Sequence, residues 1–188
     1  MPKVIDHDEY REELLSQCLE LFAREGYGAL SMRKIADALD VSTGTLYHYF
    51  SSKEDLFHQL VEVITCQDLF DAETALKDAE TLDARIDALL RFIEERESSF
   101  LNQVFIWMDY YRNITPEAEP GPREALIEYE EGIARLLGTE DPEIARFILV
   151  MMNGLVIQRY LDGGRTSLEG QSALIRDFLI QRKAKGSL

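Results

Sequence analysis

The chain has few of the residues that build disulfide frameworks, metal sites or low-complexity segments. Its 188 residues include two cysteines, Cys18 and Cys66, and three histidines, at positions 7, 48 and 58. The cysteines form no C-x-x-C pair and the histidines do not cluster with them, so we expect a reducing cytoplasm, no metal site and no cofactor. With five prolines and 11 glycines, a collagen-like or low-complexity chain is excluded.

Positive charge and long apolar runs are also scarce. Lys and Arg number 20 against 35 Asp and Glu, and the net charge of −15 argues against non-specific coating of nucleic acid or anionic lipid. The first residues turn acidic too early for a signal peptide, and no apolar run approaches 18 residues, so we expect no membrane partner. The remaining composition, 46% hydrophobic and 29% charged, is typical of a globular protein.

Helical periodicity runs through the whole chain. Apolar residues recur at three- and four-residue spacing, and no strand pattern or internal repeat interrupts them. Serines and Asp141 stand at N-cap positions, and glycines stand where helices should stop. We therefore predict an all-α fold, with helices near residues 8–25, 31–39, 43–50, 52–64, 82–93, 99–114, 126–137, 142–162 and 166–183.

Three short helices in the first fifty residues form a helix-turn-helix pattern. Asp40-Val41 makes a tight turn, and the helix after it reads Thr43-Gly-Thr-Leu-Tyr-His-Tyr-Phe50. Leu46 and Phe50 lie one helical turn apart and point into a core, which leaves the other side chains mostly outward. In such a unit the second of the two helices lies in the major groove of DNA.

The outward residues suit contact with a DNA duplex. Threonine reaches base edges or thymine methyl groups, and glycine lets the backbone come close to the DNA. Tyrosine, histidine and lysine tips reach phosphates, and the stretch 31–53 sums to +1 in this acidic chain. The predicted DNA contacts are Ser31, Arg33, Lys34, Thr43, Gly44, Thr45, Tyr47, His48, Tyr49 and Lys53.

These residues resemble the DNA-binding domain of the TetR/AcrR transcriptional regulators. The resemblance covers about residues 10–60 and rests on four blocks in order: Phe22-Ala-Arg-Glu-Gly26, Ser31-Met-Arg-Lys-Ile-Ala36, Val41 to Phe50, and Ser52-Lys-Glu-Asp-Leu56. It implies a helix-turn-helix domain over residues 1–52 and a helical ligand-binding and dimerisation domain over 53–188. The family pattern usually has two aromatics followed by His. Here the order is Tyr47-His48-Tyr49, so the phosphate contact falls to His48 or to Tyr49.

The helix at 99–114 is crowded with bulky side chains. One face of it supplies the predicted ligand-binding residues Phe100, Val104, Trp107, Met108 and Tyr111, with a plain hydrophobic core as the alternative. Asp109 falls on the opposite face, where we expect it in solvent. The predicted ligand is a small, largely apolar effector of unknown identity.

The helix at 142–162 is apolar on two sides. Its two stripes are Ile144, Ile148, Met151 and Leu155, and Ala145, Leu149, Met152 and Val156. A helix that is apolar nearly all round needs cover on both sides. This predicts a homodimer in which this helix and the last one pair with a second copy, as the resemblance also implies. The alternative is a helix buried centrally in its own domain.

Together these patterns favour a ligand-responsive cytoplasmic transcriptional regulator, a repressor that binds a palindromic operator in double-stranded DNA as a homodimer. An activator or a ligand-independent DNA-binding regulator is the alternative. An interaction module that has kept the fold and lost DNA binding is a third. A helical enzyme finds no support, because no glycine-rich phosphate loop, H-E-x-x-H or nucleophile–base motif is present.

Overall fold

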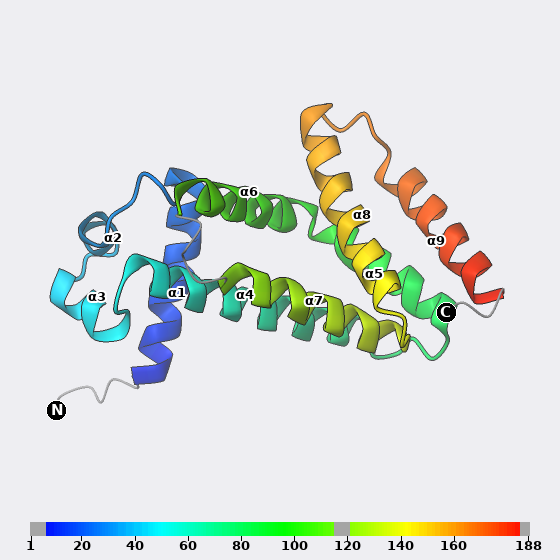
Figure 1. Ribbon diagram of the computed structural model, residues 1–188, viewed down its shortest axis with the longest axis horizontal. Helices are drawn as coiled ribbons and strands as arrows, with labels where there is room; N and C mark the ends of the chain where they lie inside the picture. The colour runs from blue at the N-terminus through cyan, green and yellow to red at the C-terminus, as the bar shows by residue number, and fades with distance from the viewer. Residues whose placement is uncertain (1–6, 115–120, 185–188) are drawn as a thin grey trace. The chain divides into compact units, whose positions relative to one another are not determined.

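The computed structural model describes residues 7–114 and 121–184, and these residues form nine α-helices and no strand (Figure 1). The prediction of an all-α fold is confirmed. The helices are α1 (His7–Glu25), α2 (Met32–Ala38), α3 (Thr43–Tyr49), α4 (Lys53–Leu76), α5 (Leu82–Glu95), α6 (Glu97–Asn113), α7 (Gly121–Leu137), α8 (Pro142–Leu161) and α9 (Leu168–Ala184).

The chain packs as two compact units. Among the described residues, the first unit comprises residues 7–64 and 105–114 with the first two residues of α7, and the second comprises residues 65–104 and 123–184. Helices α4 and α6 each contribute residues to both units. The predicted boundary between residues 52 and 53 separates a DNA-binding domain from a ligand-binding domain, not two packing units. It stays a prediction.

The core of the first unit uses the apolar faces expected for its helices. Leu14 and Phe22 of α1, Ile35 of α2, and Leu46 and Phe50 in and after α3 are each at most 1% exposed. Full burial of one such side chain contributes about 1.5–3 kcal/mol to folding. These residues hold the three short helices together as one body.

The second half of α6 belongs to this first unit through Tyr110. The Tyr110 ring is fully buried and stacks on the Phe57 ring of α4, with centroids 4.4 Å apart. The Tyr27 ring stands edge-on to the Tyr110 ring, with centroids 4.9 Å apart. The Tyr110 hydroxyl lies 2.7 Å from His58 Nε2. These contacts tie α6 to α4 and to the loop that follows α1.

Asp109, the neighbour of Tyr110, also binds this loop. The Gly28 backbone N–H donates a hydrogen bond to Asp109 Oδ2 at 2.9 Å. Asp109 was expected in solvent; it is half-buried, and its carboxylate also binds the protein backbone. Its carboxylate satisfies a loop N–H that has no helical partner, a role that the periodicity of α6 does not reveal.

The buried face of α6 differs from the predicted one. Its buried residues are Phe100, Gln103, Ile106 and Tyr110. Of the predicted face, Phe100 is buried, Val104 and Trp107 are half-buried, and Met108 and Tyr111 are 53% and 38% exposed. Bulky side chains surround this helix, so counting apolar residues does not identify its buried face. Two polar residues lie on that face: Gln103 bonds to the buried Asp68, and Tyr110 bonds to the half-buried His58.

Helices α8 and α9 form an antiparallel hairpin in the second unit. The Phe147 and Phe178 rings lie 4.8 Å apart, and Asp141 at the start of α8 pairs with Arg182 near the end of α9 at 3.5 Å. Both apolar stripes of α8 are mostly buried within the unit. The buried residues are Ile144, Ala145, Ile148, Leu149, Met152, Leu155 and Val156. The stripes thus match the alternative of a helix covered by its own domain.

Helix α8 is also the one candidate membrane span in the described part of the chain. It has 20 residues with a mean hydropathy of 1.3 in its most apolar window. The core helices of soluble proteins pass the same test of length and composition. Both stripes of α8 are buried, but only 33% of this window is buried in all, and apolar side chains such as Val150 and Leu161 are exposed.

Candidate DNA-binding surface and ligand pocket

The turn between α2 and α3 is closed by backbone hydrogen bonds around one left-handed residue. Asp40 has a φ of 54°, and the Val41 N–H donates to the Ala36 carbonyl at 3.0 Å. Aspartate is among the few residues besides glycine that adopt this conformation routinely. Ser42 caps α3 as expected, because its hydroxyl accepts a hydrogen bond from the Thr45 N–H at 2.9 Å. The turn and the cap hold α3 against α2.

Helix α3 presents polar groups on its outer face. The Tyr47 side chain is 52% exposed, and Gly44 and His48 are also exposed. Thr43 and Thr45 are half-buried, and the Thr45 hydroxyl lies 2.7 Å from the hydroxyl of the capping serine. The outer face therefore offers hydroxyl, phenol and imidazole groups beside a position with no side chain.

Nothing in the packing of the protein requires glycine at position 44. A Cβ added at Gly44 would come no closer than 3.6 Å to another atom, the Ser42 Oγ. This is an ordinary van der Waals distance. Glycine would be required here if an external surface came close to the backbone, because glycine has no side chain to keep that surface away.

The two candidates for a phosphate contact at the end of α3 have different surroundings. The Tyr49 hydroxyl lies 3.0 Å from His7 Nδ1, and its ring stands edge-on to Tyr10 with centroids 5.6 Å apart. His48 is exposed. Tyr49 thus has contacts within the first unit that link α3 to α1. The His48 ring also lies near the rings of Tyr49 and His7, with centroids 5.1 and 5.9 Å away, but His48 remains more exposed than Tyr49.

Two of the predicted cationic contacts lie on α2. The Arg33 side chain is 85% exposed, with Asp37 at 4.0 Å, the limit of an ion pair. The Lys34 ammonium donates to the Ala29 carbonyl at 2.8 Å. Ser31 caps α2 and accepts a hydrogen bond from the Lys34 N–H at 3.4 Å. Arg33 is therefore the less constrained of the two cations.

Lys53, the predicted cation at the start of α4, is held inside the first unit. Its ammonium donates to the carbonyls of Tyr27 and Leu30 at 3.0 and 2.9 Å and lies 4.0 Å from the centre of the Tyr27 ring. Partial burial lowers the pKa of Lys53, while Glu54 and Asp109 act in the opposite direction. Lys53 thus stabilises the loop between α1 and α2, whatever it also does toward DNA.

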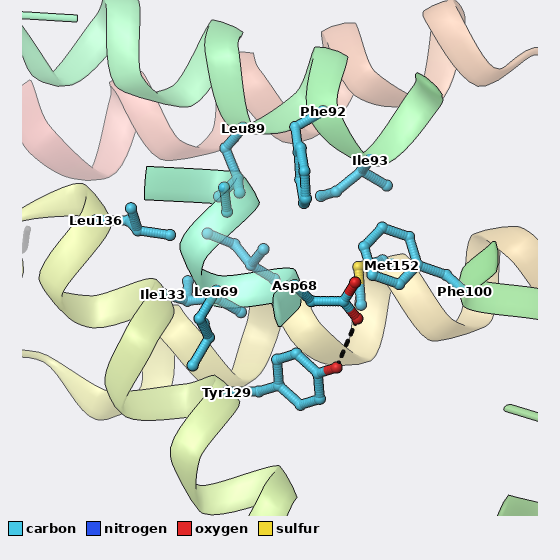
Figure 2. Close-up of a pocket in the computed structure, with 12 residues that line it drawn as sticks. Asp68, Leu69, Leu89, Phe92, Ile93, Phe100, Tyr129, Ile133, Leu136 and Met152 are labelled. Carbon is cyan, nitrogen blue, oxygen red and sulfur yellow. Dashed lines mark hydrogen bonds between the residues drawn. The ribbon is translucent and has the colours of Figure 1, made fainter. Parts of the chain in front are cut away.

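The second unit contains a small apolar pocket between α4, α5, α6, α7 and α8 (Figure 2). Its cavity volume is about 30 Å³, room for about two water molecules. The residues that line it include Leu89, Phe92, Ile93, Phe100, Ile133 and Met152, together with Asp68 and Tyr129. A larger ligand requires movement of the flexible side chains in this wall.

The predicted ligand-binding residues are divided between the two units. Phe100 lines this pocket, whereas Val104 lies beyond its lining. Trp107, Met108 and Tyr111 belong to the first unit. The structure therefore does not bring these five residues together around the pocket in the second unit.

A buried polar group in this pocket escaped the sequence interpretation. Tyr129 and Gln103 donate hydrogen bonds to Asp68 Oδ2, both at 2.8 Å, and all three side chains are more than nine-tenths buried. Burial raises the pKa of Asp68, although the two hydrogen bonds and Arg96 oppose the change. The sequence did contain a signal for the burial of Asp68. Asp68 lies at four-residue spacing, on the same helix face, with the apolar residues Leu60, Ile64, Ala72 and Leu76 of α4.

Together the two units define a class of protein. A helix-turn-helix with an outward polar face, in a chain whose other helices surround an apolar pocket, is the architecture of a one-component transcriptional regulator. Residues 14–60, which span α1 to the first part of α4, match the sequence profile described as "Bacterial regulatory proteins, tetR family".

Similar proteins place the rest of the chain in the same class. The HTH-type transcriptional regulator BetI of Rhizobium meliloti (strain 1021) is 29% identical over 188 residues, which cover 95% of this chain and 92% of BetI. The HTH-type transcriptional repressor KstR2 of Rhodococcus jostii (strain RHA1) is 33% identical over 55% of this chain and about half, 51%, of KstR2.

A solved structure shares the fold over nearly the whole chain. The putative transcriptional regulator of Pseudomonas aeruginosa PAO1 superposes with a TM-score of 0.78 at 17% identity, covering 96% of this chain and 93% of that one. The chain thus carries, over residues 14–60, the DNA-binding domain described for the TetR family of bacterial regulatory proteins. It is a DNA-binding transcriptional regulator and not an enzyme.

Proposed function

We propose that this protein is a ligand-responsive cytoplasmic repressor that binds a palindromic operator as a homodimer. The outer face of α3 carries the proposal, because its polar side chains and bare Gly44 are exposed while Leu46 and Phe50 anchor the helix from inside. Repression is favoured over activation by the similarity to KstR2, which is named a repressor.

The surroundings of each side chain suggest how the predicted DNA contacts divide their work. Thr43, Thr45 and Tyr47 of α3 are the candidates for base edges, and Gly44 permits the close approach of the backbone. Arg33 and His48 are the candidates for phosphates, because both are exposed. Ser31, Lys34, Tyr49 and Lys53 hold the helix ends and loops of the unit through the contacts described above, so we assign them positioning as well as phosphate roles.

Enrichment from a random duplex library tests DNA recognition. We expect a palindrome whose half-sites lie about one helical turn apart, 34–36 Å. Arg33→Ala should weaken binding to all sequences and lower the salt slope by about one unit. Arg135→Ala, an equal loss of charge at an exposed site on α7, should change neither. Failure to enrich any sequence would contradict the proposal.

The proposed dimer surface lies on the exposed faces of α8 and α9. Four large apolar side chains there, Val150, Leu161, Leu174 and Phe178, are between 42% and 72% exposed. These replace the stripe residues as interface candidates. Leu155 is 8% exposed, so a charge at that position would damage the core of the protomer rather than test the interface.

Sedimentation of single variants tests this surface. Leu174→Glu should convert a dimer into a folded monomer, because an unpaired charge would be buried at the contact. Ile127→Glu, a matched change at a 56% exposed site on α7, should leave the dimer intact. A well-folded wild-type monomer at micromolar concentration would contradict the proposal.

Ligand response is proposed to act through the two helices shared by both units. Asp68 and Leu69 of α4 and Phe100 of α6 line the pocket, and the same two helices are joined in the first unit by the bond between the half-buried His58 and the buried Tyr110. A ligand that favours one arrangement of α4 and α6 changes the spacing between the helix-turn-helix domains of the two protomers. The expected coupling free energy between ligand and operator binding is about 1–3 kcal/mol. Ligand and operator must then weaken each other by the same factor, which titration of each in the presence of the other measures.

A further inference from the structure

Two histidines and two tyrosines meet where the start of α1 passes the end of α3. The His7 Nδ1 atom lies 3.0 Å from the Tyr49 hydroxyl, and the Tyr10 ring stands edge-on to the Tyr49 ring. The His48 ring completes this imidazole cluster, with its centroid 5.9 Å from that of His7 and 5.1 Å from that of Tyr49. His7 lies outside residues 14–60, so the match to the family profile does not account for it.

The two imidazoles are the outward groups of the imidazole cluster. His7 and His48 are exposed, whereas Tyr10 and Tyr49 are half-buried. The contact with the Tyr49 hydroxyl engages the His7 ring through Nδ1. The second ring nitrogen, Nε2, lies on another edge of the same ring, where it can donate a hydrogen bond to a partner outside the protein.

The acidic residues at the start of α1 lie mostly on another side of the helix. His7, Tyr10 and Leu14 follow one another at three- and four-residue spacing, on the face where Leu14 is buried in the core. Arg11 stands one helical turn after His7 and adds a positive charge near this face. The acidic residues that project from the opposite side are Glu9, Glu12 and Glu13. The part of α1 that meets α3 is therefore less acidic than the helix as a whole.

An anion suits the space beside the two imidazoles. Histidine side chains gain a proton near neutral pH, and two protonated rings 5.9 Å apart repel each other. An anion that accepts a hydrogen bond from each ring removes this repulsion and receives charge-assisted bonds. The phosphodiester groups of DNA are anions of this kind, and they flank the major groove in which α3 is expected to lie.

We propose that His7 and His48 together bind one backbone phosphate of the operator, and that Tyr49 holds the His7 ring in place for this contact. The inference rests on the operator binding proposed above. It adds a DNA contact from the first residue of α1, outside the helix-turn-helix. It also assigns both rings to the same phosphate, because their separation allows one anion to accept a hydrogen bond from each.

Neutral phosphates placed in the enriched operator test this contact. In each duplex a single methylphosphonate, which carries no charge, replaces one phosphate, and fluorescence anisotropy measures the affinity of the full-length protein. At the phosphate that meets the two rings, we expect wild type to lose about tenfold in affinity and His7→Ala and His48→Ala to lose about threefold each. The double variant should lose nothing there, because both partners of the phosphate are already missing.

A further variant separates contact with DNA from support of Tyr49. Asparagine places its amide nitrogen close to the position of Nδ1, so His7→Asn keeps a hydrogen bond to the Tyr49 hydroxyl but has neither Nε2 nor a positive charge. We expect His7→Asn to behave like His7→Ala in the methylphosphonate scan. Gln17→Ala, at an exposed site on α1 beyond the imidazole cluster, is the control and should behave like wild type. Both sites are exposed, so these variants should remain folded.

Three results would overturn the inference. If His7→Ala loses as much affinity as wild type at every neutralised phosphate, His7 does not touch the DNA backbone. If His7→Asn behaves like wild type, His7 only supports Tyr49. If His7→Ala and His48→Ala change the response at two different phosphates, the shared contact is wrong.

These results are distinguishable from failure of the proposed function. Each of the three requires an operator that the protein binds, so each leaves the proposed repressor intact. If no sequence is enriched from the random library, operator recognition itself is contradicted, and the phosphate contact is contradicted with it.

Discussion

The two compact units use their polar side chains in opposite ways. In the first unit, Ser42, Lys53 and Asp109 satisfy backbone groups at helix ends and loops, and the functional face of α3 lies on the outside. In the second unit, Asp68 and its two donors lie inside, among apolar walls. The comparison teaches that a surface site can be read from the periodicity of one helix, whereas an interior site depends on several helices at once.

The largest expected effect tests whether the second half of α6 is part of the first unit. Tyr110→Ala removes a fully buried ring and should lower the free energy of unfolding by about 3–5 kcal/mol. Tyr47→Ala, at a 52% exposed site on α3, should change it by about 0.5 kcal/mol or less. Urea unfolding measures both. Equal small effects would show that α6 is not needed by the first unit.

Lys53 sharpens the contrast between holding the fold and touching DNA. Lys53→Met leaves the carbonyls of Tyr27 and Leu30 without their donor and should destabilise the protein by about 1–3 kcal/mol. Lys77→Met, at an exposed site directly after the end of α4, is the matched control and should have little effect. Denaturation with and without operator separates the two roles. If stability is unchanged and the salt slope falls, Lys53 acts on DNA alone.

The acids of the two units should respond to pH in opposite directions. Burial raises the pKa of Asp68 above its ordinary 3.8, so the folded state binds the proton more tightly and stability is lost as the pH rises from about 3.8 through the folded value. Relative to wild type, Asp68→Asn should therefore become more stable with rising pH, by up to about 1.4 kcal/mol per pH unit within that window. Urea titrations between pH 4 and about pH 8 measure the difference.

Asp55 of the first unit is the comparison for Asp68. Burial acts to raise the pKa of Asp55, but hydrogen bonds from Gln59 and from the N–H and hydroxyl of Ser51 outweigh it, and the pKa is lowered. Its stabilisation is present above about pH 3.8 and is lost as the pH falls through the folded value. If the stabilities of Asp55→Asn and Asp68→Asn, each relative to wild type, changed with pH in the same direction, the proposed difference between the acids of the two units would be contradicted.

The smallest effect on stability is expected at Gly44. Gly44→Ala meets no close atom, so the free energy of unfolding should stay the same or rise by up to about 1 kcal/mol through better helix propensity. Operator affinity should nevertheless fall, because the new methyl group separates the backbone from DNA. Unchanged operator affinity would show that DNA does not approach this position.

Much of the first unit could be predicted because its signals are local. The apolar face of α1, the turn at Asp40, the Ser42 cap and the inward Leu46 and Phe50 each depend on residues within one or two helical turns. The family followed from the order and spacing of these same blocks. The DNA contacts themselves stay predictions, because exposure shows which groups are available and not which of them touch DNA.

The predictions for α6 and α8 were less successful, and for a physical reason. Apolar residues surround both helices, so periodicity alone does not say which side faces a neighbour. On α6 the buried side is marked by Gln103 and Tyr110, whose partners Asp68 and His58 lie 35 and 52 residues away in the chain. On α8 the stripes that suggested a partner subunit are covered by the unit itself.

The sequence by itself determined the helices, their caps, the helix-turn-helix and the family, because each of these is encoded by residue types at short spacing. Only the tertiary structure decided that Asp109 and Tyr110 serve the first unit, that Lys53 holds a loop, and that Asp68 stands inside an apolar pocket. Those outcomes depend on which distant helices meet. A buried polar group of this kind is stable only where a residue from a distant part of the chain forms a hydrogen bond with it. Short-range periodicity does not identify that residue.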